Sequence, residues 1–459
     1  MNDTICALAT APGGALGIIR ISGPQALEIL SPIFRGSGDV QSFPANTIHY
    51  GHLVEFDTVS EHPVPIDEVM VSIFKAPHSY TGEDSVEISC HGSRYILNKV
   101  LELLIQNGCR MANPGEFTQR AYLNGKMDLS QAEAVADLIA STNKATHQLA
   151  MSQLRGHFSS ELSQLREQLL RLTSLLELEL DFSDHKDLEF ADRSELLELT
   201  KTIEHHITRL AKTFETGQAL KQGIPVAIVG KTNVGKSTLL NRLLKDDRAI
   251  VSDIHGTTRD TIEDTIDING VTFRFIDTAG IRQTTDEVEQ IGIARTYAAI
   301  DKARIVLWLI DTEPSEFELA EMQDRCKDKS LLILQNKVDK ISEDFTSHLF
   351  TSSPSHLLKI SAKFGTGLDA LETAIYQAAN MPAITENDII VTSARHYEAL
   401  TRANEHLQRV INGLQQQLSG DLLSEDLRLT LDTLAEITGG QITPNEVLGN
   451  IFSHFCVGK

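Results

Sequence analysis

The residues with the most specific chemistry lie between Gly230 and Ser237, which read G-K-T-N-V-G-K-S and fit the pattern G-x-x-x-x-G-K-[ST]. An apolar run from Val226 to Val229 comes before them and a helical pattern comes after, the order that such a loop requires. Backbone N–H groups of this loop bind phosphate oxygens. Lys236 can neutralise the β- and γ-phosphates and Ser237 can bind Mg²⁺. The stretch therefore predicts a nucleoside triphosphate site.

Two later strand ends predict that the base is guanine. The run "LLILQNKVD" places Asn336, Lys337 and Asp339 after a buried strand, and "ISAK" follows a further strand. Asp339 can accept hydrogen bonds from the guanine N1–H and 2-amino group, whereas adenine lacks this donor pair and would leave the carboxylate unpaired.

A third segment, "TIEDTIDINGVTFRFIDTAG", supplies groups on the phosphate side. Its alternation about Asn269-Gly270 predicts a hairpin, Asp277 can bind Mg²⁺ through water, and Gly280 can donate its N–H to the γ-phosphate. Ligands at the carboxyl ends of parallel strands fit a doubly wound α/β fold. We expect GTP to contact Asn233, Val234, Gly235, Lys236, Ser237, Thr238, Ser252, Asp253, Ile254, His255, Gly256, Thr257, Thr258, Asp277, Thr278, Ala279, Gly280, Asn336, Lys337, Asp339, Ser361, Ala362 and Lys363.

Two polar features have a functional and a plain interpretation. Many GTPases place a glutamine after D-T-A-G to orient the attacking water, but Ile281 stands there. The next polar stretch, from Asp286 to Gly292, is locally better explained as the acidic start of a helix. Asn233 either helps to coordinate a K⁺ ion beside the phosphates or bonds its own loop backbone, and the residue alone favours neither.

The elements that must position these residues fall into zones. Residues 1 to about 120 alternate strand patterns ("TICALAT", "LGIIRIS", "EVMVSIF", "DSVEISC") with helical ones ("GPQALEILSPIF", "SRYILNKVLELLIQNG"). From about 127 the pattern is helical, and one continuous apolar stripe predicts the core of a helical bundle. The stripe comprises Leu154, Phe158, Leu162, Leu165, Leu169, Leu172 and Leu176.

Strand and helix patterns alternate from 224 to near 380, and helical patterns then return. We therefore expect a multidomain α/β protein: an α+β domain at 1–120, a helical domain made of 121–220 and 381–459, and a Ras-like P-loop GTPase domain inserted at 221–380.

Composition limits the class of protein. The net charge of −22 argues against a free-standing nucleic-acid binder, which is usually basic. Five scattered cysteines favour a reducing compartment. The N-terminus lacks the basic region of a signal peptide and no apolar run is long enough to cross a bilayer, so we expect a cytoplasmic protein.

The whole chain resembles the tRNA-modification GTPases called MnmE or TrmE. The resemblance rests on "GIIRISG", "SYTGEDSVEISCHG", "NPGEFTQRAYLNGKMDLSQAEAVADLI", the phosphate loop with Asn233, "IHGTTRD", "DTAGIR" with "DEVEQIGI", and the terminal "FCVGK". One departure is visible, because the family's loop usually reads G-x-P-N-x-G-K-S and Thr232 replaces the proline.

The resemblance implies a K⁺-activated GTPase that forms a homodimer through its N-terminal domain. With a flavin-dependent partner of the MnmG or GidA type, in a heterotetramer or larger complex, it would modify C5 of the wobble uridine in certain tRNAs, adding an aminomethyl or carboxymethylaminomethyl group. By position, the K⁺ ligands would be Asn233, Ser252, Ile254 and Thr257, and the Mg²⁺ ligands Ser237 and Thr258. The catalytic residues would be Glu289, which would orient the water, Lys236 and Cys456.

The resemblance also implies a tetrahydrofolate derivative, 5-formyl- or 5,10-methylene-tetrahydrofolate, as the source of the one-carbon unit. Its residues by position would be Arg20, Glu87, Lys126 and Lys459. A pterin shows the same donor pair as guanine, which Glu87 could accept, and the basic residues could meet the carboxylates of folate. Without the resemblance, each of these residues is a solvated surface charge.

The tail "CVGK" has the length of a prenylation box, but Gly458 and Lys459 fit that pattern poorly, so we expect no stable membrane anchor. Thr443 to Glu446 predict a helix start that delivers the tail towards the folate site, where Cys456 is catalytic or merely buried. The alternative function is a GTP-dependent switch that binds RNA or ribosomes without chemistry.

Overall fold

The computed structural model describes residues 3–56, 62–181, 193–246, 264–276, 289–340, 357–381, 385, 388–440, 445–453, 455 and 458. The chain forms two compact units. The first combines Met1–Ala140, Ala150–Glu204 and Arg402–Lys459, and the second combines Ser141–Leu149 with His205–Thr401. The domain boundaries expected at 120, 220 and 380 stay a prediction.

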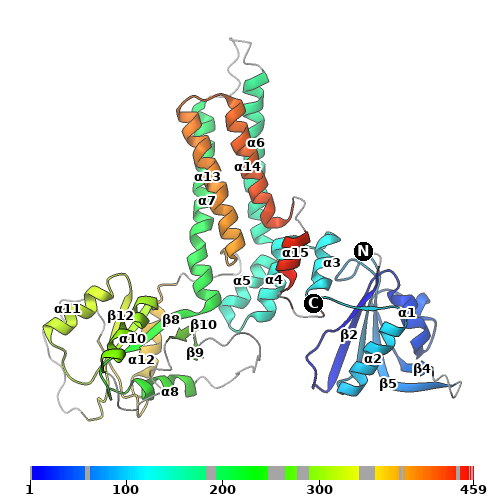
Figure 1. Ribbon diagram of the computed structural model, residues 1–459, viewed down its shortest axis with the longest axis horizontal. Helices are drawn as coiled ribbons and strands as arrows, with labels where there is room; N and C mark the ends of the chain where they lie inside the picture. The colour runs from blue at the N-terminus through cyan, green and yellow to red at the C-terminus, as the bar shows by residue number, and fades with distance from the viewer. Residues whose placement is uncertain are drawn as a thin grey trace. The chain divides into compact units, whose positions relative to one another are not determined.

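The first unit begins with a seven-stranded sheet in the order β3-β4-β5-β6-β2-β1-β7, which lies beside the helices α1 and α2 (Figure 1). Neighbouring strands are antiparallel except for the parallel pair β1 and β7. The elements are β1 (Ile5–Leu8), β2 (Leu16–Ser22), α1 (Ala26–Ile33), β3 (Phe34–Gly36), the 3₁₀ turn η1 (Val40–Ser42), β4 (Thr47–Phe56), β5 (Pro63–Phe74), β6 (Ser85–His91), α2 (Arg94–Gln106) and β7 (Arg110–Met111).

Alternation along the strands divides this sheet into two faces. Ile19 and Ile21 of β2 and Ile88 of β6 are fully buried in the core that also contains α1 and α2. The residues between them point to the opposite face, where Arg20 of β2 lies in register with Glu87 of β6. The sheet thus places two of the predicted folate residues directly opposite each other.

The predicted strands β1, β2, β5 and β6 and the helices α1 and α2 are confirmed, but several other elements were missed. Among them is β4, in which Ile48 and Tyr50 are exposed on one face, so its pattern lacks the apolar alternation of a half-buried strand. The register shift between Leu53 and Val54 disturbs that pattern further.

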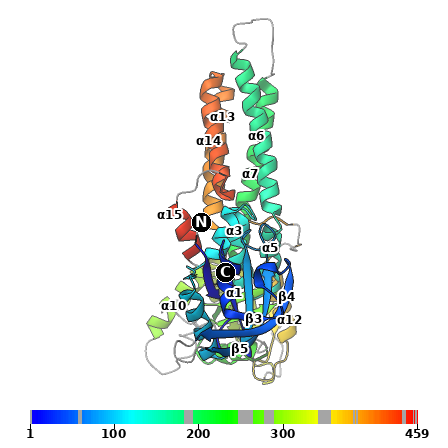
Figure 2. The ribbon, with the colours of Figure 1, turned by 90° about the vertical axis from the view of Figure 1, so that its right-hand side faces the viewer.

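The helical part of the first unit brings α6, the first part of α7, the second part of α13 and α14 side by side (Figures 1 and 2). The helices of this region are α3 (Glu116–Leu123), α4 (Leu129–Ala140), α5 (Lys144–Leu154), α6 (His157–Asp181), α7 (Arg193–Gln222), α13 (Ala394–Gln415), α14 (Gly420–Thr438) and α15 (Asn445–Ser453).

The apolar stripe is confirmed as bundle core from Phe158 to Leu176, whose six members are at most 5% exposed. The segment predicted to be helical from Leu154 onward is interrupted at 155–156, because α5 ends at Leu154 and α6 begins at His157. Gly156 between them has φ +83°, a left-handed conformation that ends a helix.

The second unit contains a six-stranded sheet in the order β13-β12-β11-β8-β10-β9, parallel except for the pair β9 and β10. One face packs on α8 and α12 and the other on α10 and α11, which makes a doubly wound three-layer domain. Its elements are β8 (Ile224–Val229), α8 (Lys236–Asp246), β9 (Asp264–Ile268), β10 (Val271–Phe275), α10 (Glu289–Lys302), β11 (Ile305–Ile310), α11 (Glu316–Arg325), β12 (Ser330–Gln335), β13 (Leu357–Lys359) and α12 (Leu368–Ala378).

The hairpin predicted at Asn269-Gly270 joins β9 to β10, and its two turn residues have φ +53° and +81°. Positive φ at both positions is what a two-residue hairpin turn requires. The start of α5 is bound to this hairpin, because Ala145 N–H donates to Gly270 O at 3.1 Å and Asn143 Nδ2 donates to Thr272 Oγ1 at 2.7 Å. Ala145 and Leu149 belong to the same core as β8, β9 and β10.

The chain is therefore built from an α+β domain at its N-terminus, a helical region that is discontinuous in sequence, and a P-loop α/β domain inserted into it. Within the described ranges, every helix is either too short or too polar to cross a bilayer.

Candidate functional site

The phosphate loop lies between β8 and α8, as the sequence predicts. Gly230, Asn233 and Gly235 all have positive φ, at +148°, +60° and +107°, which curls the backbone into a cradle. Lys236 Nζ lies over this cradle and donates to Gly230 O at 2.7 Å and to Lys231 O at 2.8 Å. Burial lowers the pKa of the Lys236 ammonium below its ordinary value of 10.5. A cation held at reduced solvation is suited to an anionic ligand.

The base-reading loop is bound to the phosphate loop through Asn336, which is 2% exposed. Its Nδ2 donates to Val234 O at 2.7 Å, and its Oδ1 accepts from Ala362 N–H at 3.0 Å. One buried amide thus holds three predicted nucleotide loops at fixed positions. Gly235 lies against it, because an added Cβ there would overlap Asn336 Nδ2.

Asp339 lies at the end of this base-reading loop. Ser361 Oγ donates to Asp339 Oδ1 at 2.6 Å, and this hydrogen bond holds the pKa of the carboxyl below its ordinary value of 3.8. The carboxylate keeps free lone pairs for the two guanine donors, so the residues present fit GTP. Lys337 has φ +62° and its Nζ pairs with Asp311 Oδ2 at 2.7 Å.

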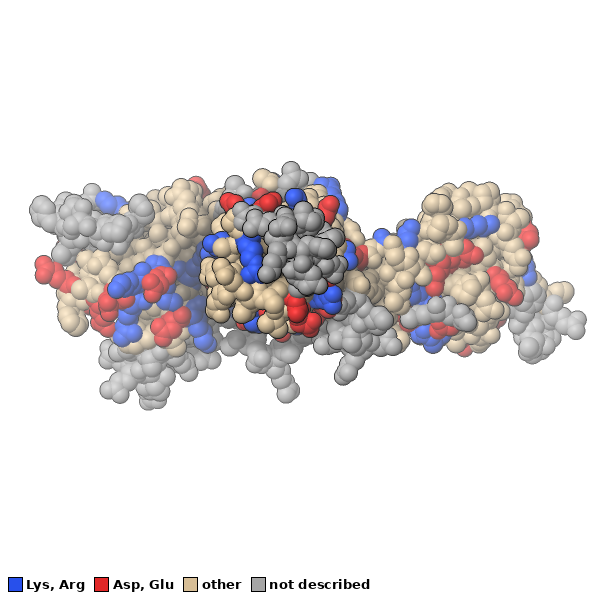
Figure 3. Space-filling model, turned by 90° about the horizontal axis from the view of Figure 1, so that it is seen from above, with Lys and Arg blue, Asp and Glu red and all other residues tan. Residues whose placement is uncertain are grey.

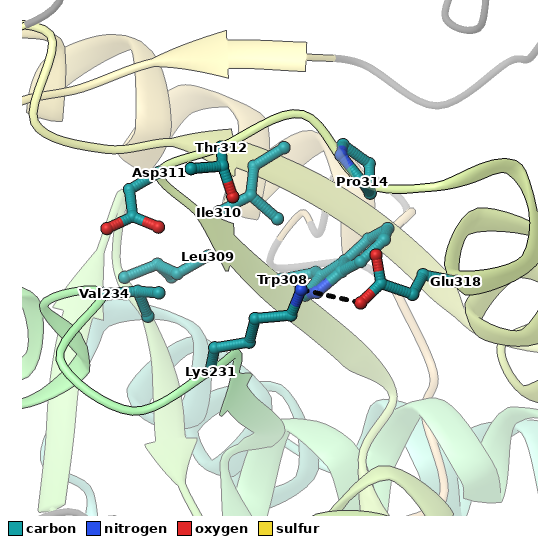
Figure 4. Close-up of a pocket in the computed structure, with 9 residues that line it drawn as sticks. All are labelled: Lys231, Val234, Trp308, Leu309, Ile310, Asp311, Thr312, Pro314 and Glu318. Carbon is teal, nitrogen blue, oxygen red and sulfur yellow. Dashed lines mark ion pairs between the residues drawn. The ribbon is translucent and has the colours of Figure 1, made fainter.

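Three residues in or beside the phosphate loop were given no role by the sequence analysis. Lys231 Nζ pairs with Glu318 at 2.7 Å across a pocket lined by Trp308, and Asp311 lies on the side of Val234 (Figure 4). Asp311 follows the buried strand β11, so the rule that ligands gather at carboxyl strand ends gave a signal for it. Lys231 and Glu318 gave none.

Many predicted phosphate-side residues lie outside the described residues. These are Ser252, Asp253, Ile254, His255, Gly256, Thr257, Thr258, Asp277, Thr278, Ala279 and Gly280, and the side chain of Glu289. Asn233 and Ser237, the predicted K⁺ and Mg²⁺ ligands within the described chain, lie in the loop and at the start of α8.

A second candidate site lies on the open face of the N-terminal sheet. Arg20 Nη2 pairs with Glu87 Oε1 at 2.7 Å, and its guanidinium lies 5.5 Å from the ring centre of Tyr80 and 5.7 Å from that of Phe117. Lys126 Nζ donates to Pro77 O at 2.9 Å, in the loop that carries Tyr80. The two aromatic residues were not predicted.

The C-terminal tail approaches the same site. Arg20 Nη1 donates to Gly458 O at 3.4 Å, and the ring of Phe455 packs on Phe452 of α15 with centroids 5.2 Å apart. Thr443 and Cys456 and Lys459 lie outside the described residues. A guanidinium, a carboxylate and the exposed ring of Tyr80 are groups that suit a planar heterocycle with carboxylates, so the described residues fit a folate, whereas Phe117 is fully buried beneath Arg20.

Lys and Arg lie among Asp and Glu on the face shown in Figure 3, within the described part of the chain. That face therefore presents charges of both signs rather than one basic field.

The phosphate loop and the guanine-reading loop define a GTP-binding protein of the P-loop class. A family model for the "MnmE helical domain" matches residues 129–456, and one for the "GTP-binding protein TrmE N-terminus" matches residues 4–126. The chain belongs to the tRNA modification GTPase MnmE family, and it is a GTPase involved in tRNA modification.

The relatives span the whole chain. The tRNA modification GTPase MnmE of Phocaeicola vulgatus is 54% identical, over 100% of this chain and 99% of the relative. That of Bacteroides thetaiotaomicron is also 54% identical, over 100% of both chains. Among solved structures, the G domain of the T. maritima FeoB iron transporter is 23% identical and covers 34% of this chain and 98% of its own, with a TM-score of 0.26 that is too low to carry an argument.

Proposed function

We propose that the chain is a K⁺-activated GTPase that acts with a flavin-dependent partner of the MnmG or GidA type on C5 of the wobble uridine in certain tRNAs. The added aminomethyl or carboxymethylaminomethyl group takes its one-carbon unit from a tetrahydrofolate. The observation that supports this proposal is a pair of carboxylates held by neighbouring side chains, Asp339 by Ser361 at 2.6 Å and Glu87 by Arg20 at 2.7 Å. Each carboxylate could accept the donor pair that guanine and a pterin share. The working form is a homodimer, in the cytoplasm, within a heterotetramer or larger complex.

GTP hydrolysis requires a water oxygen to attack the γ-phosphorus while the bond to the β-phosphate oxygen breaks, which yields GDP and phosphate. Lys236 neutralises the charge that develops on the phosphates, and Ser237 with Thr258 holds Mg²⁺, which supplies further positive charge. Glu289 orients the water. This assignment gives Ile281 no role in the reaction.

Asn233, with Ser252, Ile254 and Thr257, holds K⁺ beside the phosphates in this proposal. The exposure of Asn233 in the phosphate loop supports it, because an exposed amide oxygen is accessible to an ion. The ion supplies the charge that an arginine finger supplies elsewhere.

At the N-terminal site, Glu87 accepts the pterin donors, and Arg20, Lys126 and Lys459 meet the negative charge of the folate. Arg20 already pairs with Glu87 at 2.7 Å, so the pterin must share that carboxylate with the guanidinium. The contact of Gly458 O with Arg20 supports a role for the tail at this site, and Cys456, two residues before Gly458, is assigned to the uridine chemistry.

Nucleoside analysis of tRNA from a deletion strain tests the proposal. We expect the wobble uridines that carry the C5 group to be unmodified in the deletion strain and restored by the wild-type gene. Normal wobble uridines without the gene would end the proposal and favour a GTP-dependent switch that binds RNA or ribosomes.

The ion dependence is tested separately by measuring GTP turnover in K⁺ and in Na⁺ at equal ionic strength. We expect turnover to fall sharply in Na⁺, because the smaller ion fits the same ligands poorly. Equal rates would remove the role given to Asn233.

A further inference from the structure

Beside the Arg20–Glu87 pair lies a cluster of charged side chains that none of the roles above uses; Arg120 and Glu116 are buried at its centre, and Asp3 and Arg110 are partly exposed at its edge. Arg120 of α3 is 1% exposed. Its Nη1 donates to both Glu83 oxygens at 3.3 and 3.2 Å, and its Nη2 donates to Asp3 Oδ1 at 2.9 Å and to Glu116 Oε1 at 3.0 Å. Arg110 closes the cluster by pairing with Asp3 at 2.7 Å and with Glu116 at 2.6 Å.

Hydroxyl groups continue this cluster to the strands that hold Arg20 and Glu87. Ser22 Oγ donates to Glu83 Oε2 at 2.8 Å and lies 2.7 Å from Thr81 Oγ1. Ser22 lies in register with Ser85, one alternation along the same two strands from the pair Arg20 and Glu87. Because residues two apart in a strand share a face, the cluster adjoins the candidate folate site directly.

The same cluster fixes the loop at 76–84, which carries Tyr80. Ser79 Oγ donates to Glu83 O at 2.5 Å, and Asn124 Nδ2 donates to Thr81 O at 2.8 Å. Tyr80 OH bonds Thr118 Oγ1 of α3 at 2.9 Å, and Thr118 is fully buried. The ring that lies beside the Arg20 guanidinium is therefore held at both its backbone and its hydroxyl.

Stability alone is a poor explanation for such a cluster. Removing charges from water costs more than their mutual attraction often returns, and well-packed apolar residues would stabilise the site as well or better. Arg120 Nε has no hydrogen-bond partner among the described residues, but through Nη1 and Nη2 the cluster still gives the chain segments that it joins a single geometry. Here it joins the N-terminal strand, the loop at 76–84 and α3.

We infer that Glu83 and Arg120 are positioning residues for the folate site, acting through the loop at 76–84 to hold Tyr80 against Arg20 and to keep Arg20 on Glu87. This inference rests on the folate binding proposed above. It assigns to Glu83, Arg120 and Thr118 a function in recognition of the pterin, although none of the three need touch it.

The test compares the affinity for 5-formyl-tetrahydrofolate of the wild type and of Glu83→Gln, by calorimetry with the full-length chain. Gln keeps the shape of Glu83 but loses the negative charge and one of the two oxygens that accept from Arg120, so we expect affinity to fall by about tenfold, the scale typical of residues that orient ligand-contacting groups. Hydrogen exchange of the peptide that contains residues 76–84 should rise in the same variant. GTP hydrolysis should stay at the wild-type rate.

A matched control is Glu55→Gln, which breaks an ion pair with Lys99 at 2.7 Å on the same sheet but outside the cluster. It should leave folate affinity unchanged. Thr118→Val removes only the hydroxyl that bonds Tyr80 OH, so it is a second and milder variant. We expect it to weaken the binding of 5-formyl-tetrahydrofolate as well.

The outcomes separate the inference from the proposed function. If the wild type does not bind 5-formyl-tetrahydrofolate, the folate site and this inference both fall. If the wild type binds it and both Glu83→Gln and Thr118→Val bind it equally well, the folate site stands and the positioning role is wrong.

Discussion

The two candidate sites of this chain are built in different ways. In the nucleotide site, backbone groups of loops at strand ends form the cradle, and one buried amide, that of Asn336, joins the loops. In the N-terminal site, side chains from two strands, one loop and one helix meet, and the buried charges around Arg120 hold them together. The difference teaches that a site made of backbone is specified by short motifs, whereas a site made of side chains is specified by register.

The largest effect is expected at the nucleotide site, whose cradle is made of backbone groups. Gly235 has φ +107° and lies against Asn336, so Gly235→Ala strains the loop and displaces the amide. We expect GTP affinity to fall by about 100-fold, from a strain of about 3 kcal/mol. Titration with a fluorescent GTP analogue measures it. Unchanged affinity would mean that the loop tolerates a side chain where the structure leaves no room for one.

The next effect concerns the base. Asp339→Asn keeps the shape of the residue but replaces one acceptor with a donor, so GTP should bind about 10- to 100-fold more weakly. Xanthosine triphosphate, which carries the complementary carbonyl, should bind the variant better than GTP. Competition between the two nucleotides measures the preference, and a variant that still prefers GTP would contradict the assigned role of Asp339.

Low pH should destabilise the two regions to different extents. The hydrogen bond from Arg110 lowers the pKa of Asp3 below 3.8, and although burial alone would raise the pKa of Glu116, hydrogen bonds from Arg110, the Asn113 N–H and Arg120 hold it below 4.5. Groups with a lowered folded pKa add stability above their unfolded pKa, and this stability is lost as pH falls through the folded value.

We therefore expect the protection of β1 and α3 from hydrogen exchange, taken relative to the intrinsic exchange rate at each pH, to fall as the pH falls below about 4.5. Fluorescence of Trp308, the single tryptophan, reports the P-loop domain and should change less. Glu116→Gln should make β1 and α3 less sensitive to acid. If β1 and α3 respond to acid identically in the wild type and in Glu116→Gln, the cluster does not cause their sensitivity to acid.

The smallest effect concerns Lys236 in the nucleotide-free chain. Burial lowers its pKa, so the unfolded chain binds more protons between the lowered value and 10.5, and stability should rise slightly with pH across that window. Lys236→Met should abolish nucleotide binding. It should also remove this pH dependence of the free energy of unfolding. Urea unfolding followed by Trp308 fluorescence, at several pH values below 10.5, measures it, and a variant with the slope of the wild type would refute the cause.

The sequence was sufficient for features that local geometry dictates. The hairpin at Asn269-Gly270 could be predicted because only a few residue types accept two positive φ angles in succession. The phosphate loop and the loop of Asn336 were predictable for a similar reason. The helix break at Gly156, by contrast, was not predicted, because the periodicity of the apolar residues continues across the break.

The N-terminal site could be predicted only in part, and only through resemblance. Arg20 and Glu87 have ordinary positions in their strands, and their meeting depends on the pairing of β2 with β6. Glu83, Arg120 and Asp3 lie far apart in the chain and are joined by a loop and a helix whose approach no local pattern encodes. Tyr80 and Phe117 were missed for the same reason.

The contacts between the start of α5 and the β9–β10 hairpin limit how this gene can be recombined with its relatives. Part of the core of the P-loop domain, at Ala145 and Leu149, is encoded well before the domain's own first strand. A chimaera that exchanges only residues 221–380 would pair a foreign hairpin with the resident Asn143 and Ala145. The inserted domain is therefore not a self-contained cassette, and a tolerated exchange has to carry the segment at 141–149 with it.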